Sequence, residues 1–92
     1  RCHSWYARRY AAAMARKKAR RGIQERFGDA VRARREELGL TQEALAGRAG
    51  VHRTYLSDIE RGSRNVSLVN IEKLAAGLST SMAELMRAAE GG

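Results

Sequence analysis

One short segment of this chain brings together side chains of the types that most often carry out chemistry. His52, Ser57 and Asp58 offer a base, a hydroxyl and a carboxylate within one short segment. Their spacing does not bring a base onto a nucleophile along one helix, and no glycine-rich phosphate loop follows a strand pattern. We therefore do not expect an enzyme.

A metal site is not expected either. The conceivable companions of His52 are Cys2 and His3, and an adjacent Cys and His without further ligands make a poor zinc site. A chain of 92 residues also has room for one hydrophobic core and no separate ligand-sensing domain. No cofactor and no small-molecule ligand are expected.

The composition predicts that helices position the remaining polar side chains. Proline is absent, aromatic residues are few, and Ala, Leu, Arg and Glu dominate, which favours helix over sheet. A first helix with one inward face, ending at Gly39, is indicated by the spacing of Ile23, Phe27, Val31, Arg34 and Leu38. Four more are expected over Gln42–Arg48, over 52–61, after a cap at Ser67 and after a cap at Ser81. The fold class is thus all-α, a compact five-helix domain.

The second and third of these helices lie in the stretch TQEALAGRAGVHRTYLSDIERG. Gly50 supplies the positive φ of a tight turn, Ala46 is small where the two helices would cross, and the outer face of the second is polar. Two short helices joined in this way allow the second to enter the major groove of DNA. A structural hairpin within another kind of helical bundle is the alternative.

At this point the sequence resembles the phage-repressor and Cro-like (XRE) helix-turn-helix regulators, with a lambda-repressor-like fold, over residues 27–89. Within that family, RTYLSDIERGSRNVSLVNIEKLA looks most like the controller proteins of restriction-modification systems. The resemblance implies a sequence-specific transcription regulator that binds double-stranded DNA. It also implies contacts to phosphates or base edges by Gln42, Arg53, Thr54, Tyr55, Ser57, Arg64 and Asn65.

Physical chemistry supports most of these assignments. Arg53 can fork onto the two acceptors of a guanine, while Thr54 and Tyr55 offer methyl, ring and hydroxyl surface to thymine or phosphate. Gln42 begins a helix, where free N–H groups favour a phosphate. Acids near phosphates are repelled. We therefore interpret Glu60 as the partner of a nearby Arg, and Asp58 as the residue that orients Arg53 or Arg61, itself a candidate DNA contact.

The formal charge of +8 is concentrated at one end. Residues 1–26 hold nine of the 18 basic residues and one acid, which leaves nine basic and nine acidic residues for 27–92. We divide the chain into a basic N-terminal arm, 1–22, and a helix-turn-helix domain, 23–92. The arm either follows DNA phosphates without reading sequence or is a solvated tail. Because Met14 reads like a bacterial start, residues 1–13 have the alternative interpretation of vector or upstream sequence.

Localisation and assembly are further expectations. The start RCHSWYARRY lacks the apolar core of a secretory signal, so we expect the cytoplasm of a bacterium or of a phage host, with the protein on the nucleoid. An organelle transit peptide is the alternative for an Arg-rich end. Apolar residues in excess of what a small core needs predict a homodimer on a roughly palindromic operator. The residues expected at its interface are Leu78, Met82, Leu85 and Met86.

Two other roles use the same fold. An antitoxin would bind DNA through the helical domain and neutralise a toxin through a free segment, for which only the arm is available. A coactivator-type bridging module would use the fold to contact protein. Neighbouring genes distinguish these roles, since either a methyltransferase with an endonuclease or a toxin would stand beside this gene.

Overall fold

The computed structural model describes residues 21–91. This range contains no strand and five helices, α2 (Ile23–Glu37), α3 (Gln42–Ala49), α4 (Arg53–Glu60), α5 (Leu68–Gly77) and α6 (Met82–Gly91). The expected five-helix, all-α class is therefore confirmed. Most of the predicted arm, together with Cys2 and His3, lies outside the described residues. None of the five helices has the length and apolar character needed to cross a membrane.

Local sequence signals set the helix boundaries. The hydroxyls of three capping residues each accept a hydrogen bond from the backbone N–H three residues later, at 3.0 to 3.2 Å, and these residues are Thr41, Ser67 and Ser81. Gly50 ends α3 with a φ of +74°, in the left-handed region that glycine adopts without strain. Helix α4 starts one residue later than expected, because His52 is its N-cap and lies outside the helix.

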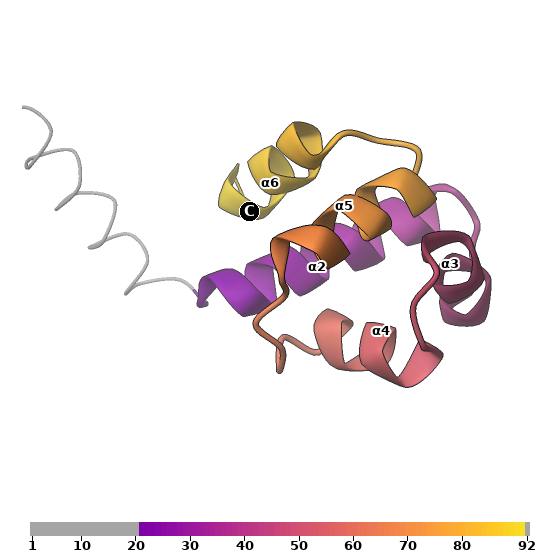
Figure 1. The fold of residues 1–92 in the computed structure, drawn as a ribbon. Helices are drawn as coiled ribbons and strands as arrows, with labels where there is room; N and C mark the ends of the chain where they lie inside the picture. Colours follow the sequence, from indigo (N-terminus) through magenta and orange to yellow (C-terminus); the bar gives the residue numbers. More distant parts are fainter. Residues whose placement is uncertain (1–20, 92) are drawn as a thin grey trace, which may run out of the picture.

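Helix α2 is the longest element and runs through the middle of the molecule, with α6 and α4 packed against it, while α3 packs against α5 (Figure 1). The core is formed by apolar side chains from all five helices, and its largest fully buried members are Val31, Leu45, Leu56, Ile59, Leu74 and Leu78. This apolar core holds the short helices in place, because helices of eight residues are not stable alone.

The inward face predicted for α2 is only partly correct. Phe27 and Val31 are buried, but Ile23, the first residue of the helix, and Leu38, which caps its end, are 38% and 37% exposed. Arg34 makes polar contacts instead of apolar ones: its Nε donates to the carbonyl of Leu78 at 3.0 Å, where α5 ends. A cation that binds the free carbonyls at a helix C-terminus is favourable.

Candidate nucleic-acid interface

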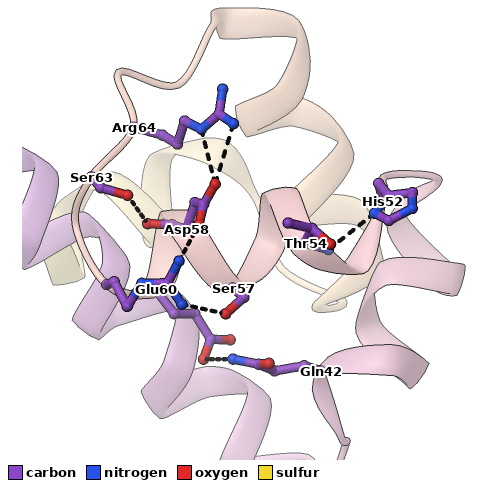
Figure 2. Close-up of polar contacts among 9 residues, drawn as sticks. Gln42, His52, Thr54, Ser57, Asp58, Glu60, Ser63 and Arg64 are labelled. Carbon is purple, nitrogen blue, oxygen red and sulfur yellow. Dashed lines mark hydrogen bonds and ion pairs between the residues drawn. The ribbon is translucent and has the colours of Figure 1, made fainter.

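Helix α4 presents one buried and one exposed face. Leu56 and Ile59 are 0% and 1% exposed and anchor the helix to the core. Arg53 and Thr54 are exposed, and neither side chain makes a hydrogen bond to any residue within 21–91. The Nδ1 atom of His52 accepts a hydrogen bond from the backbone N–H of Thr54 at 3.1 Å, which caps the helix (Figure 2). The first turn of α4 is therefore rigid in its backbone and free in its outer side chains.

Tyr55 is half-buried and held on two sides. Its hydroxyl accepts a hydrogen bond from the Asn70 amide at 2.9 Å, which ties α4 to the first turn of α5. The Arg64 guanidinium lies 5.3 Å from the centre of its ring, within the range of a cation–π contact. Tyr55 and Arg64 are predicted from the sequence as DNA contacts, whereas the contact from Asn70 to the Tyr55 hydroxyl is not.

Asp58 forms ion pairs with two arginines that follow α4. Its carboxylate pairs with Arg61, one turn along the chain, and with Arg64 at 3.2 Å (Figure 2). Arg61 also donates to the Ser57 hydroxyl at 2.8 Å. The prediction that Asp58 orients Arg61 is confirmed, and within residues 21–91 Arg53 is not among its partners. Asn65, also selected from the sequence, is exposed in the loop that carries Arg64.

Glu60 is the last residue of α4, at the opposite end from Arg53. It is the partner of an arginine, as predicted. The Arg35 guanidinium binds its two carboxylate oxygens at 2.7 and 3.0 Å. The Gln42 amide donates to one of these oxygens at 3.0 Å, a contact drawn in Figure 2. Burial alone would raise the pKa of Glu60, but hydrogen bonds from Arg35 and Gln42 outweigh it, and the pKa is lowered. The carboxylate is thus ionised at neutral pH.

Neither of the two basic residues that reach this carboxylate was selected from the sequence. Arg35 is one, and its pKa is raised mainly by its hydrogen bonds to Glu60. Arg32 is the other, with its Nε 3.5 Å from Oε1 of Glu60. Their spacing of three residues places them on one face of α2. That spacing was a signal that could have marked them as a pair.

Two of the four residues expected at a dimer interface lie in the core of the protomer. Leu78 and Leu85 are 0% and 3% exposed in the core of the protomer, so the premise that this core cannot cover them is wrong. Met82 and Met86 are half-buried against the same core. The large apolar side chains that are most exposed within residues 21–91 are Leu68 and Val69, at 75% and 61%.

Comparison with known proteins identifies relatives that match about two thirds of this chain. The model of a protein family described as helix-turn-helix matches residues 31–85. The chain is 48% identical over 64 residues to control protein C.MunI of a Mycoplasma species, covering 68% of this chain and 86% of that protein. It is 49% identical over 61 residues to control protein C.BamHI of Bacillus amyloliquefaciens, covering 65% and 75%.

A solved structure agrees with these sequence matches. The restriction-modification controller protein C.AhdI from Aeromonas hydrophila is 48% identical and superposes with a TM-score of 0.66, covering 67% of this chain and 94% of that one. The predicted resemblance to such controller proteins is confirmed.

Proposed function

The chain belongs to the helix-turn-helix family, and on this premise we propose that it regulates transcription by binding a roughly palindromic operator as a homodimer. The relatives named as controllers of restriction-modification systems support the same role for this chain. The protein then acts by binding and not by catalysis, in the cytoplasm, on double-stranded DNA.

The exposed first turn of α4 is the observation that carries this proposal. Arg53 and Thr54 project from a helix whose backbone is fixed by a cap and by two buried anchors. Tyr55, Asp58 and Arg64 are already engaged with neighbours. Arg53 and Thr54 are therefore available to contact base edges. The residues that already contact one another form a surface of fixed shape, whose arginines can bind phosphates.

A dimer would place two such helices about 34 Å apart, one DNA turn, on the same side of the duplex. The exposed pair Leu68 and Val69 supports an assembly through the first turn of α5, which directly follows the loop with Arg64 and Asn65. Pairing there would join the two reading surfaces through adjacent segments.

The test is a selection of bound sequences from a random DNA pool, followed by titrations with Arg53→Ala. Loss of a bidentate base contact should reduce discrimination by roughly 1 to 3 kcal/mol per half-site, while binding to unrelated DNA changes little. Arg87→Ala is the matched control, since Arg87 is exposed on α6 and the same charge is lost. If specific and nonspecific affinity fall together, Arg53 contacts phosphate and does not read a base.

A further inference from the structure

The surroundings of Glu60 contain more positive charge than the carboxylate needs. Oε2 accepts from Arg35 at 2.7 Å, and Oε1 accepts from Arg35 and Gln42, both at 3.0 Å. The Arg35 side chain is 13% exposed and binds both oxygens, which is the geometry of a complete arginine–carboxylate pair. This pair is electrically neutral without any further partner.

Arg32 is therefore surplus to the pair. Its Nε lies 3.5 Å from Oε1, beyond a good hydrogen bond, and its side chain is 49% exposed. Its terminal nitrogens make no hydrogen bond to any side chain or carbonyl in the described part of the chain. Arg32 thus contributes one positive charge and a free guanidinium fork to the surface.

The position of this fork relates it to the DNA contact expected at Gln42. Arg32 and Gln42 approach the same oxygen of Glu60, one from α2 and the other from the start of α3. The polar ends of the two side chains are therefore neighbours, although the residues are ten positions apart in the sequence. A phosphate that reaches the Gln42 amide comes within range of the Arg32 guanidinium, whose planar fork suits phosphate oxygens.

We infer that Arg32 is a DNA-phosphate ligand that acts beside Gln42 at the junction of α2, α3 and α4. The inference rests on the proposed function and adds a residue from outside the helix-turn-helix pair. Arg32 belongs to α2 and lies near Glu60, at the end of α4 that is opposite to Arg53. Its contact with a phosphate therefore supplies affinity and register without sequence discrimination.

Salt titrations with a fluorescently labelled duplex of mixed sequence, about two turns long, test this inference. Binding to such DNA is almost wholly electrostatic, and each phosphate contact contributes about 0.9 to the slope of log affinity against log salt. Arg32→Gln should flatten the slope by about 0.9 per bound subunit. Arg32→Lys, which keeps the charge, should retain the slope of the unmodified chain.

Arg87→Gln is the control, because it removes the same charge from an exposed residue of α6 and should leave the slope unchanged. Thermal unfolding of each variant establishes that the domain remains folded. A folded Arg32→Gln variant with an unaltered slope overturns the inference and leaves Arg32 as a peripheral partner of Glu60. An unmodified chain that binds no duplex even at low salt overturns the proposed function instead.

Discussion

At the scale of single residues, the carboxylate of Glu60 has the strictest requirements, because its side chain is fully buried at the end of α4. A buried charge is tolerated only when it is paired and hydrogen-bonded, and here Arg35 and Gln42 fulfil both conditions. The same contacts join α2, α3 and α4. Loss of this one side chain would therefore disturb three helices together.

Glu60→Gln should lower the free energy of unfolding at neutral pH by about 3 kcal/mol, because Arg35 loses its charged partner. The lowered pKa of Glu60 gives the acid dependence. Its ionised form stabilises the fold above the carboxyl's ordinary pKa, and this contribution is lost as the pH falls through the lowered value. The variant should therefore lose less stability between neutral and acidic pH than the unmodified chain.

Denaturant titrations across this pH range provide the measurement. Glu84→Gln serves as the comparison, since Glu84 is 62% exposed in a surface pair with Arg87 and should change stability by less than about 1 kcal/mol. Equal acid sensitivity of the Glu60→Gln and unmodified chains would show that Glu60 does not govern the acid response.

These residue-scale partners were only partly predictable from the sequence. That Glu60 pairs with an arginine follows from the cost of an unpaired acid near phosphates. Which arginine it binds does not, because Arg35 is 25 residues away and reaches it only through the crossing of α2 and α4. The hydrogen bond from Asn70 to Tyr55 depends in the same way on how α5 packs against α4.

At the scale of elements, Gly28 determines how closely α2 approaches α4. A Cβ atom there would overlap the carbonyl oxygen of Ile59 and lie 2.9 Å from that of Glu60. Both atoms belong to backbone, so relief requires the two helices to separate. The glycine that lowers the helix propensity of α2 therefore permits the contact between Arg35 and Glu60.

Gly28→Ala should destabilise the domain by about 1 to 3 kcal/mol through overpacking, and it should weaken DNA binding because α4 is displaced. Gly47→Ala gives the opposite expectation: apart from its chain neighbours and the nearby backbone of its own helix, nothing lies within 4 Å of a Cβ placed there, and alanine should stabilise α3 by about 0.5 to 1 kcal/mol. Thermal unfolding of both variants tests whether Gly28→Ala lowers the stability of the domain and Gly47→Ala raises it. A neutral Gly28→Ala would mean that this crossing is not tightly packed.

Helix boundaries, in contrast to crossings, were predictable nearly to the residue. The signals are local: a capping hydroxyl such as Thr41 satisfies free N–H groups at one end, and a glycine such as Gly50 adopts the left-handed conformation at the other. Gly28 shows the limit of such signals. Its role depends on Ile59 and Glu60, more than thirty positions further along the chain, and no local pattern reveals that contact.

At the scale of the whole molecule, the amount of apolar sequence did not predict where apolar surface lies. The number of apolar residues at the end of the chain predicts that Leu78 and Leu85 lie on an interface, yet they are 0% and 3% exposed within the protomer. The most exposed of the large apolar side chains in residues 21–91 are instead Leu68 and Val69, which begin α5. Self-association, if it covers apolar surface, is therefore expected there.

Leu68→Glu should convert the proposed dimer to a monomer, because a charge would have to be buried in the pairing surface of both copies. Sedimentation at tens of micromolar gives the oligomeric state, and the circular dichroism spectrum should be unchanged because Leu68 is 75% exposed. Leu85→Lys should behave differently and unfold the protomer, since Leu85 is 3% exposed in its core.

Ala44→Glu adds the same charge to an exposed position of α3 and should leave the dimer intact. On DNA, Leu68→Glu should reduce affinity for a two-half-site operator far more than for an isolated half-site, because the two reading helices would no longer be joined. A folded Leu68→Glu variant that still sediments as a dimer would place the pairing surface elsewhere. A monomeric unmodified chain would rule out the homodimer at that concentration.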